Sequence, residues 1–530
     1  MASRAFHKQT QLGIMIIVAL ISINCGSASL ESSSGSSTSS TSVVSENISA
    51  LTLAENSSTD ITLSDVDDDE DIMLVLYSYN SSSSATGVQL GTSAPDVSSQ
   101  FLGKANLDED ITKDFHQQIR SLERNISDDA EIASANQSAF LKYATSVGST
   151  KTFKVLSSLS STSSYDTITA ELRYTTSHFE FYVDTRNEDD LDDADLEELA
   201  NDFEVSALQN LFGEESDVDG NGKFAVLFSQ TVNELGASAG GIVTGFFYAV
   251  DLFDDAQYSV SNEMEIFYTL VPDENGDHGT TLTKSFCMSN IYPTVLPHEL
   301  QHMINFNQHY FLNSSSSEES WLNEGLSHLA EDISSIDATG YMAQTSIENP
   351  SRVSSYLSNV EDICFSCGSS LSQRGGTYLF LRYLYEQAEI GNLNNVNDGA
   401  DLIELLLDTN EIGLDNLTTA LYGSSGDEDD LQEVMGQFSL AVYLSNTGTT
   451  TNSKYNFSGI NLRSTQDDNR STILSGPNTQ DVTSLSFTDT LSGLSMMYLN
   501  ILGQDINDNG GSLTITVGSD GLMGGYVIRD

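Results

Sequence analysis

The chain has 530 residues, which is long enough for a sizeable core and for more than one domain. Its 20 Lys and Arg residues against 77 Asp and Glu residues give a formal net charge of -57. A surface this acidic repels phosphate backbones and anionic lipid headgroups, so the composition argues against nucleic acid as a partner and against direct adsorption to a membrane.

The first 25 residues have the layout of a signal peptide. Arg4 and Lys8 supply positive charge, and the apolar run at 12–23 is too short to span a bilayer comfortably. The run closes at Cys25, in a setting that resembles a bacterial lipoprotein signal of the loose form found in spirochaetes. The resemblance implies that Cys25 is lipidated and anchors an exported protein to a bacterial membrane, at the outer membrane or cell surface. Plain secretion is the alternative.

The segments that follow predict a tether and then a β-rich module. No later segment is long and apolar enough to span a bilayer, so membrane contact is expected through the lipid anchor alone. Residues 26–46 are rich in Ser and nearly uncharged, which is typical of a flexible tether. Over 47–150, apolar runs such as Ile72–Tyr79 alternate with Ser, Asn and Asp, and a helical connector is expected at 105–145.

The largest predicted domain covers 151–455 and begins with strands. A helix is expected from Asp192 through Leu211, with acidic first turns that suit the helix dipole. Apolar strands are expected at 224–228 and 265–270. Helical patterns then dominate from residue 294 to about 445.

After residue 455 the composition returns to Ser, Thr, Asn and Gly with alternating apolar runs. One such run is Leu513–Val517. This pattern predicts a separate C-terminal β-rich module over 456–530. With helices and strands in separate segments, the expected fold class is α+β.

A loop of the form D-x-D-x-N-G lies at Asp217–Gly222 and resembles the start of a calcium loop. Its twelfth position is Phe228, where an EF-hand needs a glutamate that binds calcium through both oxygens. A tight acidic turn is the favoured interpretation, and Ca²⁺ binding is the alternative.

Three cysteines remain if Cys25 is lipidated. Cys364 and Cys367 have two residues between them and can form a short-loop disulfide in an oxidising compartment, which leaves Cys287 free. Redox chemistry at this C-x-x-C is the alternative. Three thiols are too few for a structural four-cysteine zinc site.

The strongest motif is the H-E-x-x-H at His298–His302. Residues i and i+4 lie on one face of a helix, so both imidazoles can reach one ion. Thr294 is suited to be the N-cap, and Pro297 would then fall in the first turn, where its missing N–H costs nothing. Glu299 lies beside the first histidine and can act as the base for a metal-bound water. The motif predicts a zinc-dependent peptidase.

A catalytic zinc keeps three protein ligands and one position for water. A metzincin would have Gly and then His at the positions of Asn305 and Gln308, which leaves His309 one position out of register. Glu324 stands in a predicted helix whose apolar residues would hold its direction. It is therefore the expected third ligand, and Glu331 is the fallback.

H-E-x-x-H followed about twenty residues later by N-E-G is similar to the gluzincin peptidases. More narrowly, the segments 298–306 and 321–332 resemble the hyicolysin family of zinc metallopeptidases, with further likeness at 217–223, 245–247 and 375–384. The resemblance covers roughly residues 165–400. It implies a gluzincin-like (thermolysin-like) catalytic core with an edge strand that pairs with extended substrate, and the composition adds β-rich modules that flank this core.

The same resemblance implies a function and its residues. His298, His302 and Glu324 would bind Zn²⁺, and Glu299 would be the general base of an endopeptidase that acts on protein or peptide substrates. By analogy with gluzincins, Tyr378 is the candidate donor to the oxyanion, although its apolar helix also suits core packing.

His328 lies four residues after Glu324, on the same helix face. It either orients a ligand of the metal or is an ordinary buried or surface histidine.

Three other functions remain open. An aminopeptidase would need a carboxylate for the free amine, and only Met264-Glu265 is similar to the G-x-M-E-N motif of that class. A surface adhesin with a vestigial peptidase domain is the second. The third is a zymogen whose N-terminal region must be removed, although no cleavage signal is evident. The sequence does not indicate an oligomeric state.

Overall fold

The computed structural model describes residues 39–44, 47–91, 115–129, 146–159, 164–332, 348–423, 428–466, 471–519 and 521–529. The expected signal peptide with Cys25, and most of the expected tether, lie outside these residues. The described chain contains both helices and sheets, as an α+β fold requires. Among the described residues, the helices are all too short or too polar to cross a membrane.

A six-stranded mixed sheet opens the predicted catalytic region, with strands in the order β10, β11, β9, β8, β7, β6. The neighbours β8, β9 and β11 are parallel and buried along their whole length, which explains the apolar runs of β9 and β11. β10 is an edge strand and runs antiparallel to β11. The strands are β6 Thr150–Ser158, β7 Ser164–Thr175, β8 Phe179–Asp184, β9 Phe224–Phe228, β10 Gly245–Phe247 and β11 Ile266–Thr269.

The helix expected from Asp192 through Leu211 consists of two helices, α2 (Asp193–Asp202) and α3 (Val205–Phe212). Asp192 is the N-cap of α2, and it forms a capping box with Asp195. The chain turns out of the helix at Phe203, whose backbone is extended. A third helix, α4 (Gln230–Ser238), follows β9.

The H-E-x-x-H motif lies on α6 (Tyr292–Phe306), as expected, but the helix begins differently. A short α5 (Lys284–Phe286) and a π-helical turn, η3 (Cys287–Ile291), lead directly into α6. Thr294 is therefore not an N-cap, and its hydroxyl donates to the carbonyl of Ile291 at 2.9 Å. Pro297 lies inside the helix, so the expectation that it falls in the first turn is wrong.

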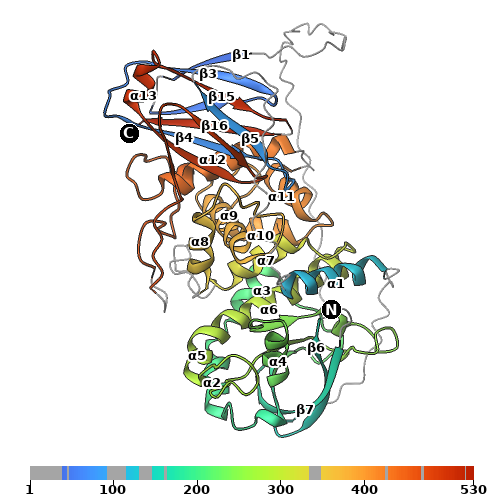
Figure 1. Cartoon of the computed structure of the whole chain (residues 1–530). Coiled ribbons are helices and arrows are strands. Elements are labelled where there is room, and N and C mark those ends of the chain that lie inside the picture. Colours follow the sequence, from blue (N-terminus) through green and yellow to red (C-terminus); the bar gives the residue numbers. More distant parts are fainter. Residues whose placement is uncertain are drawn as a thin grey trace, which may run out of the picture. The chain divides into compact units, whose positions relative to one another are not determined.

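The remaining helices complete the catalytic region. α6 continues into a second π-helical turn, η4 (Asn307–Leu312). The helices that follow are α7 Ser320–Ala330, α8 Asn349–Leu357, α9 Leu371–Glu389, α10 Gly399–Leu407, α11 Gly413–Tyr422 and α12 Leu431–Leu444. Figure 1 shows these helices following the six-stranded sheet along the chain.

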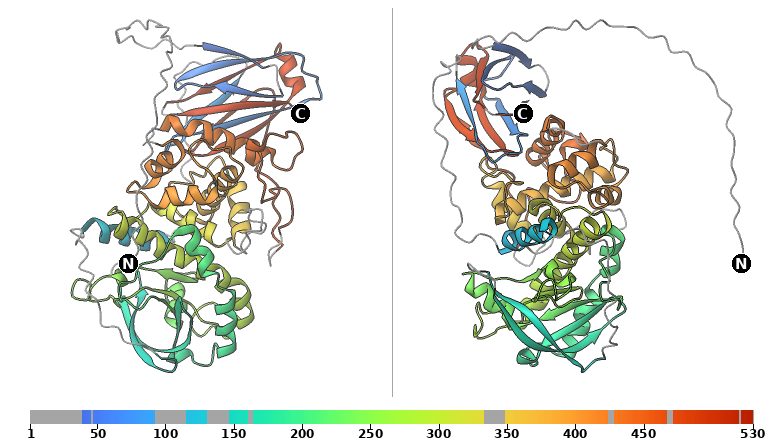
Figure 2. Two further views of the ribbon diagram at one scale, coloured as in Figure 1. Left: turned by 180° about the vertical axis from the view of Figure 1, so that it is seen from behind. Right: turned by 90° about the vertical axis from the view of Figure 1, so that its right-hand side faces the viewer.

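Strands from the two ends of the chain build two further five-stranded sheets. Their orders are β1-β3-β15-β5-β13 and β12-β14-β4-β16-β2, so each sheet mixes both ends. Blue N-terminal and red C-terminal strands lie together in this part of the structure in Figures 1 and 2. The bounds are β1 Ser39–Val44, β2 Ile48–Thr52, β3 Ser57–Leu63, β4 Asp71–Ser78, β5 Thr86–Gly91, β12 Gln480–Val482, β13 Phe487–Leu491, β14 Met496–Leu502, α13 Gly503–Asp508, β15 Ser512–Val517 and β16 Met523–Arg529.

The two β-rich segments expected as separate modules thus share their sheets. Leu74 of β4 and Leu499 of β14 pack in one apolar cluster with Ile61 of β3 and Ile515 of β15. Strand composition predicts each strand but not its partner, because pairing joins residues that are far apart in sequence.

Helix α1 (Phe115–Asp129) falls within the expected helical connector. Its buried side includes Phe115 and Ile119, and the ring of Phe115 lies 5.6 Å from that of Phe246 in β10. The helix therefore packs against the edge strand of the six-stranded sheet.

Candidate metal centre

His298 and His302 lie one turn apart on α6, and their Nε2 atoms are 3.1 Å apart. Glu324 of α7 places Oε2 at 3.5 Å from Nε2 of His298 and Oε1 at 3.5 Å from Nε2 of His302. Bonds of about 2.0–2.1 Å to a tetrahedral zinc would put neighbouring ligand atoms roughly 3.3 Å apart. The three residues that the sequence predicts as ligands therefore converge with spacings that fit a zinc ion.

Two glycines allow the helices and the strand that build the site to pack closely against one another. A Cβ at Gly325, next to Glu324, would lie 2.4 Å from Cγ2 of Thr377 in α9. A Cβ at Gly245 in β10 would lie 2.5 Å from Cγ2 of Val295 in α6. Contacts this short do not occur between real atoms, so α7 and α9, and likewise β10 and α6, pack together only with glycine at these positions.

Both imidazoles are oriented by hydrogen bonds at Nδ1, on the side away from the shared centre. Nδ1 of His298 lies 2.9 Å from Oε1 of Glu331, and Nδ1 of His302 lies 2.8 Å from Oδ1 of Asn323. An Nδ1–H that donates to an oxygen leaves the lone pair on Nε2, which is the form that binds a metal.

The fallback ligand, Glu331, thus contacts His298 from behind. His328 shares this carboxylate, with Nδ1 at 2.7 Å from Oε1 of Glu331. Burial opposes charge on Glu331, but Arg352 and His328 hold its pKa well below the usual range. His298, His328 and Glu331 are themselves close enough to form a second group of metal-binding donors. The larger group contains both imidazoles of the H-E-x-x-H motif, so it is the better candidate.

Glu299 is fully buried between α6 and β10. Its Oε2 accepts a hydrogen bond of 2.8 Å from the backbone N–H of Phe247, and its Oε1 has no hydrogen-bond partner among the described residues. Burial raises the pKa of Glu299 to about 7. A carboxylate with this proton affinity can both accept and release a proton near neutral pH.

His116 of α1 joins the centre and was not predicted. Its Nδ1 lies 3.8 Å from Oε1 of Glu324, and it belongs with the three predicted ligands to one group of donor atoms that all lie within 4.8 Å of one another. The rings of His116 and His298 meet edge to face at 5.9 Å. Nothing in the local sequence Phe115-His116-Gln117 is a metal-binding motif, and the only signal was a histidine in a predicted helix.

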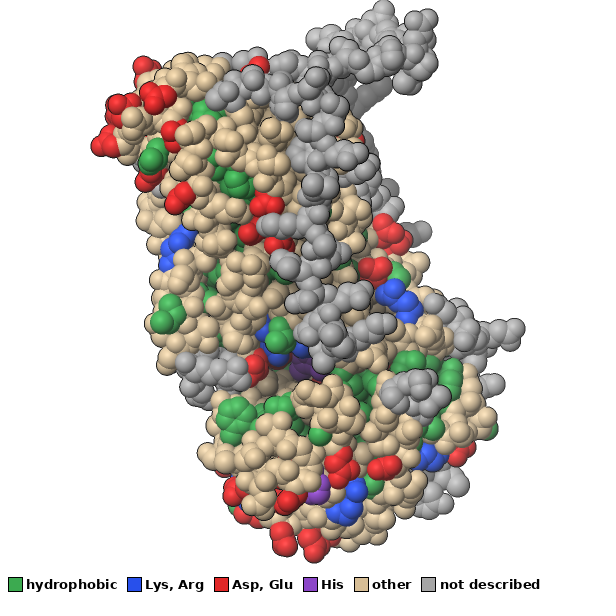
Figure 3. Space-filling view, viewed as in Figure 1, with side chains coloured by type: hydrophobic (Ala, Val, Ile, Leu, Met, Phe, Trp, Pro, Cys, Tyr) green, Lys and Arg blue, Asp and Glu red, His purple; other side chains and the backbone are tan. Residues whose placement is uncertain are grey.

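Arg374 of α9 is, after His116, the second residue at the centre that no sequence motif predicted. Its Nη1 lies 3.3 Å from Oε2 of Glu324. Burial opposes charge on Glu324, but the imidazoles around it hold its pKa well below the usual range. Figure 3 shows histidine and basic side chains together in a recess of an otherwise largely uncharged and acidic surface.

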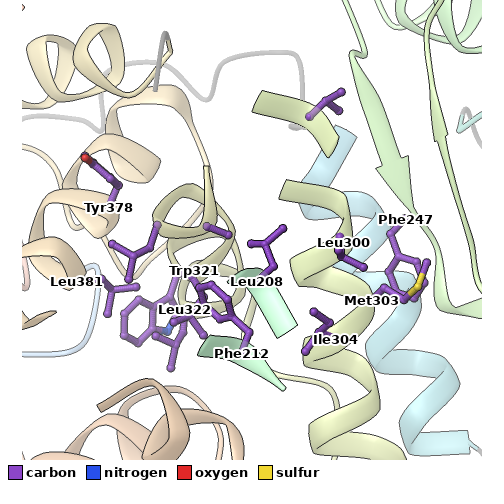
Figure 4. Close-up of a cluster of buried hydrophobic side chains, with 14 of the residues drawn as sticks. Leu208, Phe212, Phe247, Leu300, Met303, Ile304, Trp321, Leu322, Tyr378 and Leu381 are labelled. Atoms are coloured by element: carbon purple, nitrogen blue, oxygen red, sulfur yellow. The ribbon is translucent and has the colours of Figure 1, made fainter. Parts of the chain in front are cut away.

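Tyr378 lies away from the ligand atoms. Its hydroxyl donates to Oδ2 of Asp332 and accepts from Nη1 of Arg382 at 2.9 Å, and all three side chains are buried. In Figure 4 it lies with Leu381 in the apolar packing of α9. These contacts favour a structural role over donation to an oxyanion.

The acidic loop at Asp217 gains a carboxylate that local sequence did not indicate. Asp217, Asp219 and Glu265 bring carboxylate oxygens within 4.8 Å of one another. Oε1 of Glu265 accepts from Ser216 Oγ and Val218 N at 2.6 Å each, while its buried Oε2 has no hydrogen-bond partner among the described residues. Glu265 therefore belongs to the donor group of this loop and not to the group around His298 and His302.

The cysteines follow one of the two expectations. Cys364 and Cys367 form a disulfide, which confirms the short-loop pairing, and Cys287 is free and buried.

His309, which the metzincin spacing rejects as a ligand, has its Nε2 at 3.6 Å from Oε2 of Glu318, and both side chains are buried.

Two helical imidazoles, a carboxylate from the next helix and a glutamate beside them are the donor set of a metallopeptidase. No family model matches the chain. Over 191 residues, which are 35% of this chain, it is 28% identical to the neutral metalloprotease ShpI of Staphylococcus hyicus. The chain spans 40% of the length of that relative. The similarity supports a metallopeptidase.

Proposed function

We propose that this protein is a zinc-dependent endopeptidase with a gluzincin-like catalytic core at about 151–455. The observation that carries the proposal is the convergence of His298, His302 and Glu324 beside the buried Glu299. When bound, zinc supplies a Lewis acid that polarises the scissile carbonyl and lowers the pKa of water.

The protein's own residues hold and move the proton. Phe247 holds Oε2 of Glu299 through its backbone N–H, so Oε1 is the oxygen that accepts the proton of the attacking water. Glu299 then passes this proton to the leaving amine, a transfer that its raised pKa of about 7 suits. Glu331 and Asn323 keep the ligand imidazoles in the orientation that presents Nε2.

The substrate class follows from the edge strand. Among the described strands, β10 pairs only with β11, and its other edge can pair with an extended peptide. Main-chain pairing along such an edge does not need a free terminus, so the proposed substrates are internal peptide bonds of proteins. We also propose export and lipidation at Cys25, which partition of a Cys25→Ser variant between detergent and water would test.

Metal analysis of the purified protein tests the proposal. A single zinc per chain is expected. In a His116→Ala background, which removes the further histidine of the donor group, Glu324→Ala should lose the metal, and the matched Glu404→Ala, which alters an exposed glutamate on α10, should retain it. Zinc that stays bound in Glu324→Ala/His116→Ala would refute this ligand set and move the third ligand to Glu331. Hydrolysis of peptides with blocked and with free amino termini then separates an endopeptidase from an aminopeptidase. Cleavage only of peptides with a free amino terminus would contradict the proposal.

A further inference from the structure

One face of α1 carries a histidine that can bind a metal and two charged side chains that can form hydrogen bonds with backbone groups. His116, Arg120 and Glu123 follow the i, i+4, i+7 spacing of a single helix face. Arg120 and Glu123 are 4% and 1% exposed, and they form an ion pair of 2.8 Å between Nη1 and Oε2. Burying a charged pair costs desolvation free energy unless the remaining donors and acceptors of both side chains form hydrogen bonds. The groups that bind Arg120 and Glu123 therefore show which part of the protein α1 binds.

The partners are backbone groups at the end of β10 and two residues beyond it. Nη2 of Arg120 donates to the carbonyl of Phe247 at 2.7 Å, and Oε1 of Glu123 accepts from the N–H of Ala249 at 3.0 Å. Tyr248 between them is extended, with φ -139° and ψ 112°. In extended backbone, the carbonyl of one residue and the N–H two residues later point to the same side. An incoming extended peptide would use this pair of groups.

His116 acts at the metal centre in a similar way. Zinc with three protein ligands keeps a fourth position for water or substrate. Nδ1 of His116 lies in the same group of donor atoms as the three ligands and 3.8 Å from Oε1 of Glu324. Its side chain is only 14% exposed, so the helix holds it against the centre.

We infer that His116 is a fourth protein ligand of the metal, and that α1 holds the enzyme latent by covering both the metal and the edge strand. The inference rests on the proposed function. It concerns regulation of that site: α1 occupies the position of the attacking water through His116 and the position of the substrate backbone through Arg120 and Glu123. Peptide hydrolysis then requires that α1 leave its place.

Beside the apolar packing of Phe115 and Ile119, the polar part of the contact fits a helix that detaches. Once α1 leaves, the carbonyl of Phe247 and the N–H of Ala249 can bind water or substrate, and the metal can bind water. Detachment of α1 therefore leaves these polar groups with hydrogen-bond partners. A helix that is a permanent part of the core would instead leave buried polar groups unsatisfied when removed.

The first experiment counts imidazole ligands in the full-length zinc protein by X-ray absorption. Three imidazoles are expected in the wild type and two plus a water oxygen in His116→Ala and His116→Gln. Gln117→Ala, an exposed neighbour on the same helix, is the matched control and should retain three. Two imidazoles in the wild type would overturn the inference.

The second experiment measures hydrolysis of an internally quenched, amino-blocked peptide. His116→Ala should exceed the wild type by about tenfold or more in kcat/KM, because the competent population rises. The double variant Arg120→Ala/Glu123→Ala should also be activated, since loss of the two backbone contacts weakens the docking of α1 and raises the population in which the whole helix, with His116, has left the site. Equal rates in the wild type and all variants would overturn the latent state and leave the peptidase intact.

The two readouts separate the failures. Three imidazoles in the wild type, with no hydrolysis by any variant, would support His116 as a ligand and refute the proposed peptidase. Hydrogen exchange gives a third readout: wild-type protein should show slow exchange of the Ala249 amide, and the double variant should exchange it faster. Equal exchange in both would contradict docking of α1 on this strand.

Discussion

The carboxylate of Glu331 lies 2.9 Å from Nδ1 of His298, on the side of the ring opposite the shared centre. A carboxylate there makes the imidazole a stronger ligand and keeps its tautomer and ring angle. Replacing Glu331 with Gln should lower zinc affinity by about 10–100-fold, as removal of such a partner typically does.

Competition with a chelator measures this affinity. Glu404→Gln on the exposed side of α10 is the control and should bind zinc as the wild type does. Complete loss of zinc from Glu331→Gln, with zinc retained in Glu324→Ala, would instead identify Glu331 as the third ligand.

Glu299→Gln should separate metal binding from proton transfer. The amide keeps the shape of the side chain and can still accept from the N–H of Phe247 through its oxygen, so zinc content should not change. It cannot take a proton from water, and loss of a general base typically costs about 10²–10⁴-fold in rate. The comparison belongs in a His116→Ala background, where hydrolysis is expected, and an unchanged rate there would exclude Glu299 as the base.

Gly325→Ala should destabilise the fold without touching a ligand atom. Its Cβ would meet Cγ2 of Thr377 at 2.4 Å and Cδ1 of Leu381 at 2.7 Å, and overpacking of this kind costs about 1–3 kcal/mol. Thr377→Ser removes the clashing methyl group and keeps the hydroxyl that donates to Phe365, so it should recover part of the loss in the double variant. Urea unfolding measures both, and Gly241→Ala, where a Cβ meets nothing within 4 Å, is the control.

His309 and Glu318 should give opposite pH dependence of stability. Burial lowers the pKa of His309 to about 4, so the unfolded chain binds a proton at pH 4 to 6.5 that the folded chain refuses, and stability falls as pH falls through this range. Burial raises the pKa of Glu318 to about 7, so stability falls as pH rises from 4.5 to 7. Each contribution has an upper bound of about 3 kcal/mol.

The two slopes nearly cancel in the wild type, and single variants should reveal them. Glu318→Gln should become more stable, relative to wild type, as pH rises from 4.5 to 6.5, and His309→Gln should become less stable over the same range. Urea unfolding at several pH values checks the signs, and parallel curves for the two variants would contradict the assignment.

The loop at Asp217 should bind calcium through Glu265, if its buried Oε2 serves as the carboxylate that Phe228 cannot supply. Calcium at about 100 times its Kd would then stabilise the protein by about 2.7 kcal/mol, seen as a rise in Tm. Glu265→Gln should abolish this rise, whereas Glu404→Gln, an exposed position outside every candidate group of the described residues, should keep it. Equal calcium effects in the two variants would leave the tight acidic turn as the better interpretation.

Local patterns in the sequence were enough to predict the metal helix. His298 and His302 converge because four residues complete about one helical turn, which is a property of the backbone alone. The strands β9 and β11 were predicted for a similar reason, since buried parallel strands require continuous apolar runs. Glu324 could be predicted because its apolar neighbours restrict its direction on α7.

Contacts across long stretches of sequence were decided only by the tertiary structure. His116 is 182 positions before His298 (298 minus 116), and no periodicity connects α1 to α6. The same holds for Glu331 behind His298, for Glu265 at the acidic loop, and for strands from both chain ends that share two sheets. Spacing along a helix or strand is set by backbone geometry, whereas these meetings depend on how distant surfaces pack once the whole chain has folded.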